Sequence, residues 1–143
     1  MTKVVVIDGQ GGKMGKMLIE RIKDSDITCT LIAVGTNSIA TSAMLKAGAD
    51  SGATGENAVV VACRDADIII GPIGIIVADS LLGEISPIMS VAVGQSKAKK
   101  LLLPVNLCNN IIVGALAAPL TKIIAEAIVE LKKQLEGQVD PIR

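Results

Sequence analysis

A glycine-rich segment near the start of the chain carries most of the residues that could do chemistry. It follows the apolar run at residues 4–7 and Asp8, and it leads into a segment whose apolar residues have helical spacing. Such a turn between a buried strand and an amphipathic helix can hold a phosphate on backbone N–H groups. We expect the N–H groups near residues 12–14 to point at the anion, with Lys13 or Lys16 adding charge. The predicted cradle consists of Gly9, Gln10, Gly11, Gly12, Lys13, Met14 and Gly15.

The spacing of the glycines separates this segment from two better-known motifs. The dinucleotide fingerprint Gly-x-Gly-x-x-Gly fails because Met14 occupies its third glycine position. The P-loop fails because Met17 stands where Ser or Thr would bind magnesium. The pattern Gly-x-x-Gly-x-Met-Gly, at Gly9, Gly12 and Gly15, resembles the cofactor loop of dihydrodipicolinate reductases and related NAD(P)-binding domains. The alternative is a tight turn in which Gly15 only permits the helix to pack against the strand.

Neutral polar residues follow the second predicted strand. A carboxylate about 20 residues beyond the loop normally binds the adenosine ribose of NAD. Here the strand ends at Gly35, Thr36 and Asn37, with neither a carboxylate nor an arginine. Neutral donors at Asn37, Ser38 and Thr41 could bind a ribose or a 2′-phosphate, and Thr36 and Asn37 are part of the predicted cofactor site. We therefore expect NADP(H) or another nucleotide, and a different phosphorylated metabolite fits about as well.

Strands and helices are predicted to alternate along the chain. Strands are expected at residues 3–8, 28–34, 49–53, 67–70, 101–105 and 111–113, and helices at residues 12–23, 40–47, 75–82, 87–95 and 118–135. A further helix, capped by Thr54, is expected where Val59, Ala62, Cys63 and Ala66 have helical spacing. The order predicts one α/β domain over residues 1–143, a doubly wound, mainly parallel, Rossmann-like sheet with helices on both faces.

Ligands of open α/β sheets bind beyond the carboxyl ends of the strands. The turns expected at that edge add Gly71, Pro72 and Asn106 to the predicted cofactor site. Asp8 could bind a metal or a ligand hydroxyl, or it could bond to the N–H groups of the loop. Cys108 could be a thiol nucleophile, but the chain has no His to act as its base, so we expect an inert thiol. We assign no catalytic residue, and the separated cysteines predict no metal site.

The composition excludes several classes of partner. Lys and Arg number 14 and Asp and Glu number 14, so charge gives no reason to expect nucleic acid or an anionic membrane. Aromatic residues make up 0% of the chain, which removes the platforms on which bases stack. Apolar residues make up 50%, and we expect some of them to be buried in a homo-oligomer. Without a signal peptide or a spanning segment, a soluble cytoplasmic protein is predicted.

Several motifs along the chain resemble a family of short bacterial proteins known as a domain of unknown function. They lie at residues 7–12, 35–37, 40–44, 52–57 and 71–75. The resemblance implies a stand-alone protein of this size without a separate substrate domain, and it implies no established activity.

Two functions therefore stay open. The first is a Rossmann-like protein that binds a nucleotide, NADP(H) among the candidates, at residues 9–15 and that acts as a minimal oxidoreductase with an active site shared between subunits. The second is a non-catalytic oligomeric module that binds or regulates through a small anionic metabolite or a partner protein.

Overall fold

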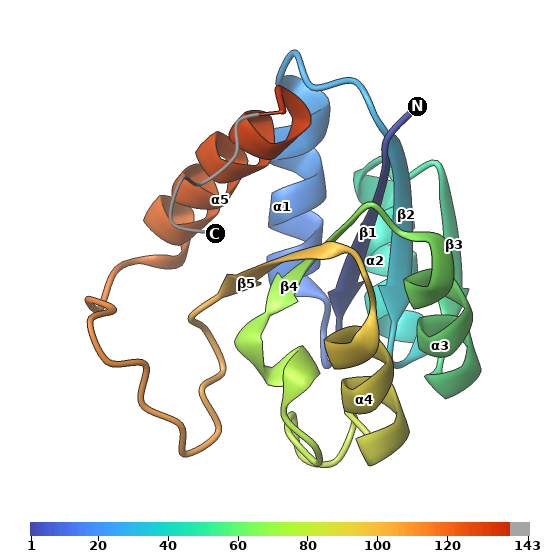
Figure 1. The fold of residues 1–143 in the computed structure, drawn as a ribbon, viewed down its shortest axis with the longest axis vertical. Coiled ribbons are helices and arrows are strands. Elements are labelled where there is room, and N and C mark those ends of the chain that lie inside the picture. The colour runs from blue at the N-terminus through green and yellow to red at the C-terminus, as the bar shows by residue number, and fades with distance from the viewer. Residues whose placement is uncertain (138–143) are drawn as a thin grey trace.

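Five parallel strands form one sheet in the computed structural model, which describes residues 1–137 (Figure 1). In chain order they are β1 (Lys3–Asp8), β2 (Thr30–Gly35), β3 (Ser51–Thr54), β4 (Ile68–Pro72) and β5 (Lys99–Leu103). The spatial order is β3-β2-β1-β4-β5, so β1 lies in the centre and Val6 pairs with both Ala33 and Ile70. The predicted doubly wound α/β fold is confirmed.

Helices cover both faces of this sheet. On one face lie α1 (Lys13–Asp24), α2 (Ser38–Ala47) and α5 (Leu120–Leu135), and on the other lie α3 (Glu56–Asp65), the short 3-10 helix η1 (Ile73–Ile76) and α4 (Pro87–Gln95). Successive side chains of a strand point to opposite faces. Accordingly, Val4 and Val6 pack in the core of the first face, while Val5 and Ile7 pack in the core of the second. This central strand is therefore apolar throughout because both its faces are buried.

Two predicted helix starts have different outcomes. The Ser86 side chain accepts a hydrogen bond from the N–H of Met89 and Pro87 opens α4, as expected. The helical interpretation of residues 59–66 is also confirmed, but the predicted cap is wrong. Gly55 is the N-cap of α3, because Thr54 ends β3 and its hydroxyl is 2.7 Å from that of Thr41 on α2.

The segment after β4 differs from its prediction. The strand was expected to end at residue 70, but β4 continues through Gly71 and Pro72. The helix expected through residue 82 is reduced to the short η1. Asp79, Leu81 and Leu82 have φ values of 67°, 54° and 55°, which a right-handed helix does not allow. Residues 77–86 therefore form a set of turns that crosses the carboxyl edge of the sheet.

Residues 111–113 are not a strand, contrary to the prediction. They lie in a loop at residues 104–119 that projects away from the sheet between β5 and α5 (Figure 1). The apolar run there meets no sheet face, since Ile111 is 88% exposed and Val113 is 94% exposed. The last helix begins two residues later than expected, with Pro119 as its N-cap.

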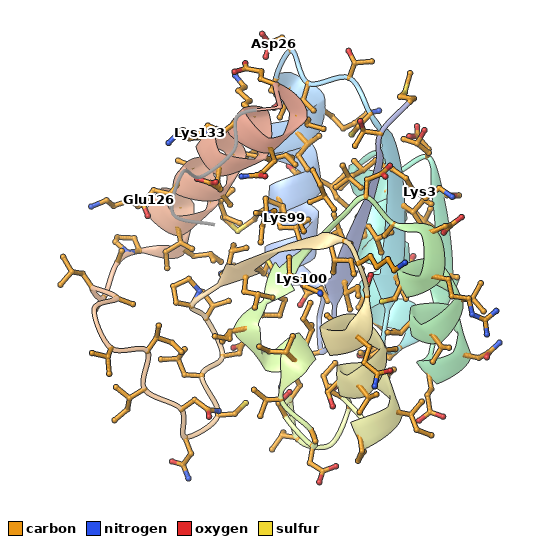
Figure 2. The ribbon with its side chains drawn as sticks, viewed as in Figure 1. Lys3, Asp26, Lys99, Lys100, Glu126 and Lys133 are labelled. Carbon is orange, nitrogen blue, oxygen red and sulfur yellow. The ribbon has the colours of Figure 1, made fainter. Side chains whose placement is uncertain are left out.

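The long helix α5 is held against α1. Its stripe of Ile124, Ala127, Ile128 and Leu131 is buried in the first core, as the spacing predicts. Near its end, the ammonium of Lys132 lies 3.2 Å from a carboxylate oxygen of Asp26, which Figure 2 shows beside the last turns of the helix. Within residues 1–137, no helix has both the length and the apolar character that crossing a membrane requires.

Candidate functional site

The side chain of Asp8 forms hydrogen bonds with both ends of the glycine loop. The residue is buried at the end of β1, and its Oδ1 and Oδ2 accept the N–H groups of Gly9 and Gly15, each at 2.8 Å. Of the roles considered for this carboxylate, bonding to loop N–H groups is the one the structure shows. Burial raises the pKa of Asp8 above its usual value; the N–H groups of Gly15 and Gly9 oppose the rise and nearby Glu84 adds to it.

The glycine spacing lets the loop pack closely on its neighbours. Gly12 has φ +75°, and a Cβ there would lie 2.8 Å from the Cα of Ala40 on α2. A Cβ on Gly15 would lie 2.5 Å from the sulfur of Met44, so this glycine serves helix packing. Gly11, in contrast, has open space where a Cβ would be.

Some N–H groups of the loop remain available. The N–H of Gly12 is bonded to the carbonyl of Gly9 at 2.9 Å, and that of Gln10 is bonded to a side chain. The N–H groups of Gly11, Lys13 and Met14 have no hydrogen-bond partner within residues 1–137. They stand at the N-terminus of the 12-residue helix α1, where unpaired donors and the helix dipole favour an anion.

A cleft of about 530 Å³ lies beside these donors. The glycine loop forms one wall and the loop after β5 forms the other, with α5 contributing two apolar side chains. The lining residues are Asp8, Gly9, Gln10, Gly11, Gly12, Lys13, Met14, Pro104, Val105, Asn106, Leu107, Leu116, Ala117, Ala118, Leu120 and Ile123. Most of the predicted cradle and Asn106 thus line one cleft.

The other predicted site residues lie elsewhere. Gly15 is buried beneath the loop, where it faces Met44. Asn37 donates a hydrogen bond to the carbonyl of Gln10 in the glycine loop, Thr36 donates one to Glu84, and neither residue lines the cleft. Gly71 and Pro72 are buried in β4, and a Cβ on Gly71 would collide with the carbonyl oxygen of Ile7.

Glu84 is a polar group at this edge that the sequence analysis did not find. It lies in the turns between η1 and α4, and its Oε1 accepts the N–H of Gln10 at 2.8 Å, the Nδ2 of Asn37 at 3.0 Å and the hydroxyl of Thr36. Burial raises the pKa of Glu84, but the three donors together outweigh burial, and the pKa is lower than usual. The order of the strands could have revealed Glu84. Because β4 pairs with β1, the segment that follows β4 must lie beside the loop that follows β1.

The cysteines are far from one another in the fold. Cys108 is exposed in the loop after β5, whereas Cys63 is buried on α3 and Cys29 is partly buried before β2. Burial raises the pKa of the Cys63 thiol to about 11. Among the described residues, no group of three or more His, Cys, Asp or Glu side chains could hold a metal ion.

Comparison with known proteins assigns the chain to a family. Residues 3–136 match the family described as Domain of unknown function (DUF3842). The chain belongs to this family. The match includes the glycine loop, Glu84 and the loop after β5, so every part of the site lies in the family's domain. A comparison with curated proteins finds no match.

Proposed function

We propose that this protein binds a nucleotide whose phosphate is held by the glycine loop. The observation that carries the proposal is the row of unpaired N–H groups at Gly11, Lys13 and Met14, which opens onto the cleft. A helix N-terminus preceded by a close-packed glycine turn stabilises phosphate through its N–H groups and dipole. NADP(H) is a candidate cofactor, and so are NAD(H) and mononucleotides.

The chemistry of the cleft suits the rest of a nucleotide. Val105, Leu107 and Leu116 provide apolar surface, and the exposed amide of Asn106 can donate and accept hydrogen bonds. Ligand sites commonly combine apolar walls with a few polar groups that fix orientation. A flat base or nicotinamide ring would therefore find both kinds of contact here.

Titration calorimetry with NADP⁺, NAD⁺, ATP and GTP tests the proposal. We expect at least one of them to bind, and we expect Lys13→Gln to weaken that binding severalfold at low salt, because an ammonium beside the phosphate is lost. Lys133→Gln is the matched control, since Lys133 is exposed on α5 away from the cleft (Figure 2). A folded protein that binds none of the four compounds would contradict the proposal.

The second candidate, an oligomeric binding module, is favoured by the loop after β5. Residues 101–121 contain no charged side chain, and Ile111, Val113 and Leu116 are 88%, 94% and 87% exposed. Exposed apolar patches commonly mark interfaces. We propose that this loop packs against a second copy of the chain, which would then border the cleft because Leu116 lines it.

Sedimentation and native mass spectrometry separate the two candidates. We expect the wild type to be oligomeric and the double variant Ile111→Ser/Val113→Ser to be a folded monomer. A dinucleotide that co-purifies supports the first candidate. A stable oligomer that stays empty and binds no nucleotide supports the second.

A further inference from the structure

The carboxylate of Glu84 contacts the glycine loop at Gln10, on the side of Thr36 and Asn37, and it is not among the residues that line the cleft. We propose that Glu84 receives a hydroxyl of the ligand's adenosine ribose, so that the site selects nucleotides in which this ribose has free 2′ and 3′ hydroxyls over those in which it carries a 2′-phosphate. The inference rests on the proposed function, because it places a sugar next to a phosphate that the loop holds.

Glu84 contacts the loop one residue before the first unpaired donor. Its Oε1 accepts the N–H of Gln10 at 2.8 Å, and the next N–H, that of Gly11, has no partner within residues 1–137. The ribose of a nucleotide is bonded directly to its 5′-phosphate, so a phosphate on Gly11 brings the sugar close to this carboxylate. Gly9 permits the approach, since a Cβ there would lie 2.9 Å from Oε1.

The two oxygens of the Glu84 carboxylate have different surroundings. Oε1 accepts hydrogen bonds from Gln10, Thr36 and Asn37. No hydrogen bond in the described part of the chain involves Oε2, and the residue is only partly buried. An ionised carboxylate accepts hydrogen bonds and donates none. Oε2 therefore suits a hydroxyl, whereas a 2′-phosphate would bring a second negative charge against it.

The turns that carry Glu84 hold it in place before any ligand arrives. Leu81 and Ile85 are buried on either side of it, and the hydroxyl of Ser80 donates to the carbonyl of Gly74. Leu81 and Leu82 adopt left-handed φ values, which are costly for residues with a side chain. A carboxylate fixed in this way loses little side-chain entropy when it binds a sugar.

Other roles of Glu84 predict different behaviour. A carboxylate that only ties the loops together would leave the preference among nucleotides unchanged when it is replaced. A carboxylate that occupies the anion site itself would compete with phosphate, so its neutralisation would tighten the binding of every nucleotide.

The experiment titrates NAD⁺ and NADP⁺, which differ only in the 2′-phosphate, into the wild type and into Glu84→Gln. We expect the wild type to bind NAD⁺ at least about tenfold more tightly, as a charge-assisted hydrogen bond and an avoided repulsion suggest. In Glu84→Gln the two affinities should approach each other, while the thermal midpoint stays within a few degrees. Glu20→Gln, at an exposed position on α1, is the control for the loss of one negative charge.

The wild-type ratio needs no variant, so it can overturn the role of Glu84 even if Glu84→Gln unfolds. Equal binding of both dinucleotides by the wild type, or an unchanged ratio in a folded Glu84→Gln, overturns the role of Glu84 and leaves nucleotide binding intact. Tighter binding of both dinucleotides by Glu84→Gln identifies a competing carboxylate and also overturns this role. If no nucleotide binds the folded wild type, the proposed function fails, and the role of Glu84 fails with it.

Discussion

The two walls of the cleft are held in different ways. The glycine loop is fixed from below by Asp8, from the side by Glu84, and by the contact of Gly12 with α2. Within residues 1–137, the hydrogen bonds of residues 106–118 all join residues of that same stretch. The glycine loop is thus packed against and bonded to the rest of the domain, so substitutions that disturb these contacts should lower the free energy of unfolding. The exposed apolar residues of the second wall, Ile111, Val113 and Leu116, can be changed with little effect on the fold, so they are free to serve binding.

The largest expected effect on the free energy of unfolding comes from replacing glycines that have a positive φ with alanine, one in each wall of the cleft. Gly12 and Gly114 have similar φ values, 75° and 88°, but only Gly12 has backbone atoms of another element where a Cβ would be placed. We expect Gly12→Ala to lower the free energy of unfolding by about 2–4 kcal/mol, since strain and overpacking add. Gly114→Ala should cost only the strain, about 1 kcal/mol.

Urea unfolding of both variants measures this difference. Gly11→Ala serves as a further control in the first wall, since nothing lies within 4 Å of a Cβ there. Equal losses for Gly12→Ala and Gly114→Ala would show that the glycine loop is not packed as described.

The next effect concerns the carboxylate beneath the glycine loop. We expect Asp8→Asn to lower the free energy of unfolding by about 1–3 kcal/mol, because the amide nitrogen would face one of the two N–H groups without accepting its hydrogen. Chemical denaturation measures the loss. Asp79→Asn, at an exposed position near the same edge, is a suitable control. A loss no larger than that of the control would show that the loop does not depend on this carboxylate.

The pH dependence of stability should have opposite signs at the two carboxylates. The folded-state pKa of Asp8 is raised from 3.8, so its stabilisation is present at lower pH and is lost as pH rises through the folded pKa. The folded-state pKa of Glu84 is lowered from 4.5, so its stabilisation is present above 4.5 and is lost as pH falls through the folded pKa. Unfolding curves of the wild type, Asp8→Asn and Glu84→Gln at several acidic pH values separate the two contributions. Slopes of the same sign would contradict this assignment.

The smallest effect is expected in the second wall. Because Ile111 and Val113 are almost fully exposed, replacing each with serine should change the unfolding free energy of the monomer by less than about 0.5 kcal/mol. Urea unfolding of a monomeric sample measures this. A loss comparable to that of Asp8→Asn would mean that the loop is part of the core after all.

Sequence patterns predicted the elements whose determinants are local. Capping by Ser86, the helical spacing around Val59 and the glycine turn after β1 each depend on a few neighbouring residues, and all three are confirmed. The strand expected at residues 111–113 failed because its apolar residues meet no sheet, which no local pattern reports. Glu84 was missed for a similar reason, since the crossover turns bring it to the loop from a distant part of the chain.

The two hydrogen bonds of Asp8 also have a kinetic consequence. They connect the first and last amides of the glycine loop to a single buried carboxylate, so a displacement of this carboxylate releases both ends at once. Hydrogen exchange at Gly9 and Gly15 should therefore proceed through one shared opening event, with protection factors that rise and fall together as temperature or denaturant is varied.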